Sequence, residues 1–184
     1  MTEFEQNGTG DAVNAEVVVQ GNNAFALALY QTLRQAAGNL FFSPYSIATA
    51  LAMTYAGARG NTAAQMVSVL HIGLADNQLH PAIAALGAQM QAVQAQGEIL
   101  LKVANALWPQ TRYPFLPAFL ALLQEHYGVS ITPIDYTDEE TARDAINTWV
   151  AANTQEKIVD LIPRGILDPL TRLVLTNAIY FKGH

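Results

Sequence analysis

Hydrophobic residues in the first part of the chain recur at helical spacing. Residues 25–36 carry an apolar stripe, with Asn22 or Asn23 as a start signal and Gly38 as an end signal. These features predict an amphipathic helix. The polar leader before it, residues 1–21, is predicted to be disordered.

A short apolar run and a cap signal follow this helix. Residues 39–43 are too short and too apolar for a helix, so they predict a buried strand. Ser43 followed by Pro44 predicts an N-cap and the first position of a second helix. Many small residues in that helix leave little polar surface, so it is expected to be buried nearly all round.

The pattern then changes from helical spacing to a period of two. Thr62 and Gln65 form a predicted capping box for a short helix that ends near Gly73. A stripe over residues 79–93 predicts a surface helix. Residues 98–109 alternate apolar and polar positions, which predicts a strand.

The remaining chain mixes helices with strands. Residues 114–128 are helical with a Gly128 stop, and Pro133 limits the next strand to a sheet edge or a bulge. Thr137 and Glu140 form a second predicted capping box. The final strand points one set of side chains to one face: Leu173, Leu175, Asn177, Ile179 and Phe181. Helices first, followed by strands separated by helices, predict an α+β fold.

Composition narrows the classes of partner. The chain has 184 residues, a formal net charge of -6 and only nine Lys and Arg, which form no cluster. This argues against nucleic acid as a partner. The absence of cysteine removes disulfide and thiol chemistry, and no apolar run is long enough to predict a membrane span.

Candidate catalytic and metal-binding residues form no motif. The histidines lack the i, i+4 arrangement of a helical metal site, and no serine lies in a G-x-S-x-G elbow. The acids at 138–140 fit the first turn of a helix, where the macrodipole favours negative charge. The sequence therefore predicts no enzyme, no metal site and no cofactor; the histidines are His71, His80, His126 and His184.

Polar residues at two expected core positions need a different explanation. Asn177 falls on an apolar strand face, and Ser43 and Ser46 bracket the start of the buried second helix. Buried amides and hydroxyls must be paired, because an unpaired one costs a few kcal/mol. On the residues alone, the favoured interpretation is a satisfied polar cluster that fixes register.

Motifs in register carry a resemblance to a known family. They are NLFFSPYSIATALAMTYAGARGNTAAQM, NALW, INTWVAANTQEKIVDLIP and LVLTNAIYFKG. Together they resemble the N-terminal portion of a serpin over residues 22–184. The resemblance implies the serpin fold, with the N-terminal helices and part of the central sheet A.

The resemblance also implies roles for particular residues. Ser43, Ser46 and Asn177 match the shutter, the polar network where the sheet parts to admit another strand. A further set matches the helix that lies across the sheet and the segment after it, which must yield during insertion: Asn147, Trp149, Thr154, Lys157 and Ile158.

By this resemblance the chain is expected to be the scaffold of a suicide inhibitor of serine or cysteine proteases. The sequence stops before the tryptophan of the family's breach, so the reactive-centre loop and the C-terminal half are expected to be missing. The chain alone is then not inhibitory. Two alternatives remain open, a non-inhibitory serpin that acts as chaperone or carrier, and an inactive truncated fragment. The family implies an extracellular location, whereas the lack of a signal peptide leaves the cytoplasm open.

Overall fold

The computed structural model describes residues 3–94 and 99–183 and divides into two compact units. The first is Met1–Val93 and the second is Gln94–His184, and each is described by itself. None of the helices in the described ranges combines the length and apolar character needed to cross a bilayer.

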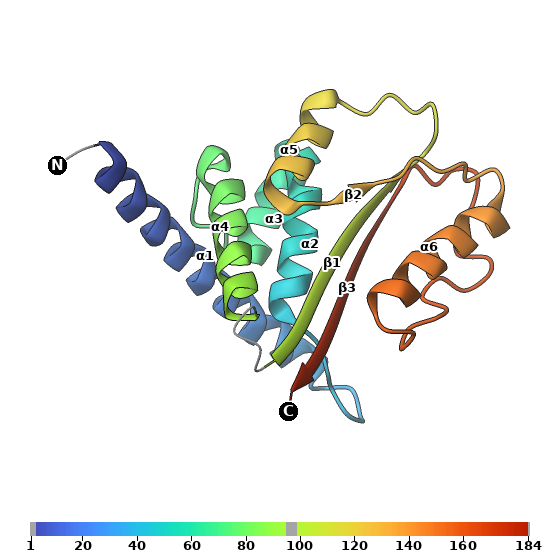
Figure 1. Ribbon diagram of the computed structural model, residues 1–184, viewed down its shortest axis with the longest axis horizontal. Coiled ribbons are helices and arrows are strands. Elements are labelled where there is room, and N and C mark those ends of the chain that lie inside the picture. The colour runs from blue at the N-terminus through green and yellow to red at the C-terminus, as the bar shows by residue number, and fades with distance from the viewer. Residues whose placement is uncertain (1–2, 95–98, 184) are drawn as a thin grey trace. The chain divides into compact units, whose positions relative to one another are not determined.

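The first unit is helical. Ser43 caps the second helix as predicted, with its Oγ accepting from the Ser46 N–H at 3.3 Å, and Pro44 is the first helical residue. The third helix starts at Gly60, before the predicted capping box of Thr62 and Gln65. Its N-cap is Arg59, whose side chain makes no capping hydrogen bond. The helices are α1 Glu3–Leu33, α2 Pro44–Gly57, α3 Gly60–Leu70 and α4 Asp76–Gln94 (Figure 1).

Two sequence predictions in this unit are wrong. Residues 3–21 continue α1 instead of forming a disordered leader, and they supply packing residues, since Ala15 is buried on the same helix as Phe25. Residues 39–43 form no strand, and Phe41 is 91% exposed. A strand needs a neighbour for its backbone bonds, and no strand in the described part of the chain pairs with this run.

The second unit contains a sheet of strand order β2-β1-β3. β1 pairs antiparallel with β3 along its whole length, and β2 lies parallel to β1 at the other edge. Pro133 lies two residues after the end of β2, and β2 is at an edge of this sheet, so the predicted edge position is confirmed. The strands are β1 Ile99–Pro109, β2 Ser130–Ile131 and β3 Leu173–Gly183, and the helices are α5 Pro117–Tyr127 and α6 Glu139–Asn153.

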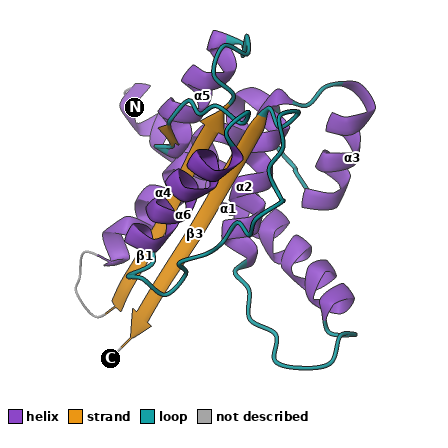
Figure 2. Cartoon of the chain, turned by 90° about the vertical axis from the view of Figure 1, so that its right-hand side faces the viewer, coloured by secondary structure: helices purple, strands orange, loops and turns teal. Residues whose placement is uncertain are grey.

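Helix α6 covers one face of the β1 and β3 pair (Figures 1 and 2). Its N-cap is Asp138, whose Oδ1 accepts from the Thr141 N–H at 3.2 Å, so the predicted capping box at Thr137 is displaced by one residue. Gly128 ends α5 at φ 56°, in the left-handed region that glycine adopts without strain. The core that α6 forms with the sheet and the neighbouring loops consists of Ala106, Trp108, Ile134, Tyr136, Ala142, Ile146, Val150 and Leu167.

Candidate functional site

The candidate site is the covering helix α6 together with the segment that returns from it to β3. Its first part is the turn after α6, where Thr154 is only 1% exposed. The Thr154 Oγ1 donates to the Val150 carbonyl at 2.9 Å and accepts from the Ile158 N–H at 3.2 Å. One hydroxyl therefore joins the last turn of the helix to the start of the segment.

Backbone conformation sharpens this turn. Gln155 and Glu156 have φ values of 53° and 60°, in the left-handed region that residues with a Cβ seldom adopt. The Glu156 N–H donates to the Ala151 carbonyl at 2.9 Å, which closes the end of α6. Consecutive residues in this region cost free energy unless the surrounding bonds hold them. The Thr154 bonds supply that support.

Asn147 fastens the middle of α6 to the same segment. Its Nδ2 donates to the Ile162 carbonyl and to Asp160 Oδ1, both at 3.0 Å. Its Oδ1 accepts from the Ile162 N–H at 2.9 Å. The side chain is 6% exposed, so this amide satisfies both backbone groups of Ile162 away from solvent.

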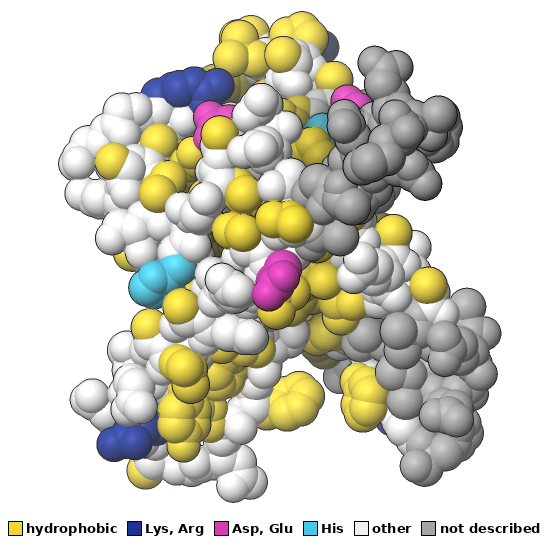
Figure 3. All heavy atoms as spheres, turned by 90° about the vertical axis from the view of Figure 1, so that its left-hand side faces the viewer, with side chains coloured by type: hydrophobic (Ala, Val, Ile, Leu, Met, Phe, Trp, Pro, Cys, Tyr) yellow, Lys and Arg dark blue, Asp and Glu magenta, His cyan; other side chains and the backbone are white. Residues whose placement is uncertain are grey.

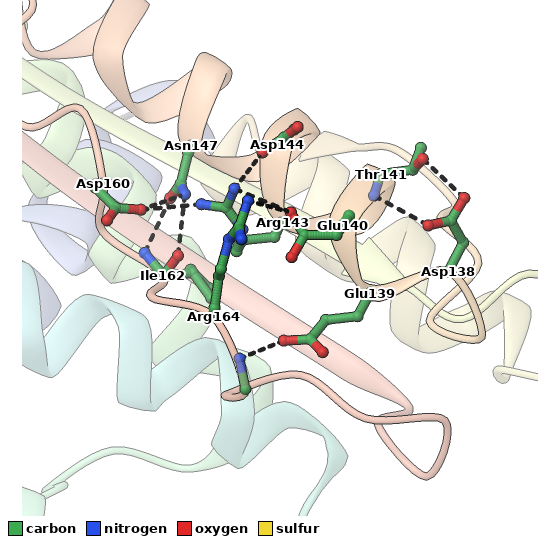
Figure 4. A network of polar contacts seen from close by, with 11 residues as sticks. Asp138, Glu139, Glu140, Thr141, Arg143, Asp144, Asn147, Asp160, Ile162 and Arg164 are labelled. Atoms are coloured by element: carbon green, nitrogen blue, oxygen red, sulfur yellow. Dashed lines mark hydrogen bonds and ion pairs between the residues drawn. The ribbon is translucent and has the colours of Figure 1, made fainter.

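A charged network continues this attachment on the outer side of α6 (Figure 4). Arg143 donates to Glu140 at 3.3 Å, to Asp144 at 2.7 Å and to Asp160 at 3.1 Å. Arg164 lies 3.4 Å from the same Glu140 carboxylate. Two of these contacts, Arg143 to Asp160 and Arg164 to Glu140, cross from the helix to the segment.

The inner side of α6 packs through aromatic rings. Trp149 meets Trp108 edge to face, with ring centroids 6.0 Å apart and planes at 85°. Trp108 Nε1 donates to Thr176 Oγ1 at 3.0 Å, and the Tyr136 hydroxyl donates to the Trp108 carbonyl at 2.6 Å. Burial raises the pKa of Tyr136, so the hydroxyl stays protonated and available as a donor.

The predicted covering residues therefore differ in what they do. Asn147, Trp149 and Thr154 hold the helix to the sheet or to the segment. Lys157 is exposed and contributes its backbone N–H to the Thr154 carbonyl at 3.1 Å. Ile158 is 40% exposed, and its backbone rather than its side chain makes the bonds to Thr154.

On the strand face, Asn177 has a partner that sequence reasoning missed. Its Nδ2 donates to Asn105 Oδ1 at 2.6 Å, and the two residues lie directly opposite each other in the antiparallel register of β1 and β3. The available signal was Asn105 itself, an amide inside the otherwise apolar stretch VANALW. A cross-strand amide pair of this kind fixes register.

Ser43 and Ser46 begin α2 in the first unit, and Ser46 is 2% exposed. Asn177 belongs to the second unit, so contact between it and the serines stays a prediction. The structure accounts for each part locally, as an N-cap on α2 and as an amide pair across the sheet.

Groups that could act as metal ligands do not gather anywhere in the described ranges. On the face drawn in Figure 3, the described residues show isolated charged side chains among hydrophobic and uncharged ones. That face displays no patch of a single charge sign, in keeping with the weak field expected from the composition.

Comparisons with known proteins agree with this arrangement. The chain is 43% identical over 171 residues to leukocyte elastase inhibitor A of Mus musculus and 41% identical over 172 residues to leukocyte elastase inhibitor of Homo sapiens. These alignments cover 91% and 92% of this chain but 44% and 45% of the two relatives. The chain thus spans less than half the length of the curated relatives it matches.

Solved structures share the fold. Ovalbumin from emu, Dromaius novaehollandiae, gives a TM-score of 0.79 at 29% identity, over 91% of this chain and 47% of that one. Arabidopsis AtSerpin1 in its native stressed conformation gives 0.76 at 28% identity, over 93% of this chain and 44% of that one. The predicted α+β fold class is confirmed.

The family model described as serpin (serine protease inhibitor) matches residues 20–184. That range holds α6, its returning segment and both members of the Asn105 and Asn177 pair. The chain belongs to the serpin family.

Proposed function

We propose that this chain is the scaffold part of a serpin that inhibits a serine or cysteine protease by inserting its reactive loop into the sheet. The observation that carries the proposal is the 43% identity to a leukocyte elastase inhibitor over 91% of the chain. Elastase is therefore the first protease to test. In this mechanism the protease cleaves the loop, the loop adds a strand to the sheet, and the acyl-linked protease is carried along and distorted.

The geometry of α6 supports a gating role for the covering segment. Loop insertion requires the sheet to open beneath the helix, so the bonds that hold the helix and its segment set the resistance to opening. Asn147 and Thr154 supply buried directed bonds at two points of this attachment. We propose that these two residues keep the sheet closed until the loop is cleaved.

A second part of the proposal concerns the shutter. Ser43, Ser46 and Asn177 are proposed to meet beneath the sheet, with Asn105 as a further member. Support comes from the burial of Ser46 and from the amide pair at Asn177. A polar network at this place would fix the closed register and still allow the strands to separate.

The 184-residue chain by itself is proposed to be neither an inhibitor nor an enzyme. The specificity residues of a serpin lie on its reactive loop, and the motifs recognised here belong to the scaffold. The inhibitory partner is then a protease that meets the loop of the whole protein.

The main experiment incubates elastase with a longer protein that carries this sequence, and separately with the 184-residue chain. A covalent complex that survives SDS is expected for the longer protein and not for the chain alone. Elastase with its catalytic serine blocked is the control, because it cannot form the acyl link. Cleavage of the longer protein without a complex, by a panel of serine and cysteine proteases, would favour the non-inhibitory alternative.

The shutter has its own test. Asn177→Ala and Ser46→Ala are combined in a double-mutant cycle on the free energy of unfolding. Residues in one network couple by about 0.5–3 kcal/mol, whereas distant residues add. Additive effects would show that Asn177 and Ser46 do not belong to one network.

A further inference from the structure

The segment that returns from α6 to β3 carries an exposed arginine that the inhibitor mechanism does not use. The side chain of Arg164 is 77% exposed, and its guanidinium lies 3.4 Å from the Glu140 carboxylate. Its neighbours Pro163, Gly165 and Ile166 are exposed and uncharged. A trypsin-like serine protease selects such a residue, because the carboxylate in its S1 pocket pairs with an arginine side chain.

The backbone around Arg164 is held by side chains. Residues 159–167 form no helix or strand, and in the described part of the chain their backbone groups bond to no other backbone group. Asn147 holds Ile162 on one side of the arginine, and the Glu139 carboxylate accepts from the Gly165 N–H on the other (Figure 4). Exposed irregular segments of this kind are preferred sites of proteolytic nicking.

The other basic residues are less suited to cleavage. Three of them lie inside regular elements: Lys102 in β1, Arg143 in α6 and Lys182 in β3. The rest lie where backbone hydrogen bonds close a turn, a helix end or a strand end: Arg34, Arg59, Arg112, Lys157 and Arg172. A protease has to break backbone hydrogen bonds at these positions, whereas at Arg164 it has to displace side chains only.

Asn147 controls access to the arginine. A protease binds its substrate as an extended strand, so the backbone of the residue two places before the cleaved arginine pairs with the enzyme. That residue is Ile162, and Asn147 already occupies its N–H at 2.9 Å and its carbonyl at 3.0 Å. The segment therefore has to leave Asn147 before it can be cut, and the rate of cleavage follows the population of this open form.

The cut ends remain close to groups that hold them. Water adds across the Arg164–Gly165 peptide bond, which leaves a carboxylate on Arg164 and an amine on Gly165 that takes up a proton. This new ammonium lies beside Glu139, whose carboxylate accepts from the same nitrogen before the cut. Downstream, Leu167 is buried in the core and β3 pairs with β1 along its whole length. The contacts that fold the second unit thus survive the loss of one peptide bond.

We propose that the Arg164–Gly165 bond is a cleavage site for an arginine-specific, trypsin-like serine protease, that Asn147 controls access to it, and that the cut chain stays assembled. After the cut, Asn147 and Arg143 still hold the upstream part of the segment to α6. The downstream part remains with β3. Cleavage therefore removes the covalent link between the covering helix and this strand, and it does so independently of loop insertion.

The test digests the purified chain with a low ratio of trypsin and follows the products by intact mass. The first products are expected to be residues 1–164 and 165–184. They should elute together in size-exclusion chromatography under native conditions and separate in denaturant. A first cut at any other lysine or arginine overturns the proposal, and so do fragments that separate without denaturant.

Two arginine variants identify the cut bond. Arg164→Gln is expected to abolish the first cleavage, because it removes the charge that the S1 pocket selects. Arg34→Gln is the matched control, since Arg34 is an exposed arginine in the loop after α1, and it should leave the first cleavage unchanged. Early products of the same mass from Arg164→Gln and from the unchanged chain overturn the proposal.

Asn147→Ala tests the control of access. Cleavage at Arg164 is expected to become about tenfold faster, the factor that one lost hydrogen bond of ordinary net strength gives. Cleavage at Arg112, in the same unit, reports general loosening and should not change. Thr148→Ala, an exposed change on α6, is the control. Equal acceleration at Arg164 and Arg112, or none, overturns the role of Asn147, and if Asn147→Ala fails to fold, the order of cuts in the unchanged chain and in Arg164→Gln decides.

Discussion

The two sides of α6 hold the same helix by different physical means. On the inner side Ile146 and Val150 are fully buried, and Trp149 packs on Trp108. On the outer side Arg143 joins carboxylates that are 51–66% exposed. The inner contacts remove apolar surface from water, whereas the outer ones link charges that water already solvates.

The two sides of α6 are therefore expected to have different effects. The inner contacts affect the stability of the unit, and the outer contacts affect how the returning segment is held to the helix. Burial of apolar side chains is expected to supply most of the free energy that keeps α6 on the sheet. The charged contacts reach across to the returning segment and are expected to affect its position more than the stability of the unit. Asn147 lies at the border, because its amide is buried and yet bonds to the segment.

The largest effect should come from the inner side. Ile146→Ala removes a fully buried side chain from the core and is expected to lower the free energy of unfolding by about 3 kcal/mol. Denaturant unfolding of the purified protein measures it. Thr148→Ala is the control on the exposed side of α6 and should change stability by less than about 0.5 kcal/mol. Equal losses in the two variants would contradict the comparison.

Asn147→Ala should come next and tests the border between the two sides. The change leaves the N–H and the carbonyl of Ile162 without their partner, at a cost of about 1–3 kcal/mol. Hydrogen exchange at the Ile162 amide should accelerate more than exchange at Val150 in the core of α6. An unchanged rate at Ile162 would mean that Asn147 does not hold the segment. In an inhibitory serpin the same variant should speed loop insertion.

The sequence predicts the local elements of the second unit well because their signals are local. The period of two over residues 98–109 marks β1, and Gly128 marks the end of α5. Pro133 identifies the edge because a missing N–H acts at one position, whatever the rest of the fold does. These features depend on a few neighbouring residues only.

Predictions fail where distant packing decides the outcome. The leader looks polar along the chain, yet Ala15 is buried and Gly21 meets the end of α3. Gly21 and His71 are fifty positions apart in the sequence, so a local pattern of residues does not predict their contact. For the site, Asn177 was identified as polar in an apolar strand, but its partner Asn105 depends on the register of two distant strands.

The outer charges should show a smaller effect than Asn147. Arg143→Met keeps the length of the side chain and removes its contacts with Glu140, Asp144 and Asp160. The loss of stability should be smaller than for Asn147→Ala and should shrink as salt is added, because salt screens exposed charges. Unfolding in low and high salt measures it. If the loss of unfolding free energy is as large in high salt as in low salt, Arg143 contributes through buried contacts and not through screened surface charges.

The smallest effect is expected at Asp135, an exposed acid in the loop before α6. Its carboxylate accepts from the Thr137 N–H at 3.0 Å and the Thr137 hydroxyl at 2.8 Å, and it accepts from Gln110 Nε2 at 3.3 Å. These bonds favour the charged form and hold the pKa of Asp135 below its ordinary value of 3.8. A lowered folded-state pKa means that the contribution to stability is present above pH 3.8 and is lost as the pH falls through the folded-state value. Asp135→Asn should therefore lower stability slightly at neutral pH, and this difference from the wild type should shrink as the pH falls below about 4, so that the acid limb of the stability curve becomes flatter. Glu125→Gln, an exposed change on α5, serves as the control, and a wild-type acid limb in Asp135→Asn would show that these loop bonds do not favour the charged form.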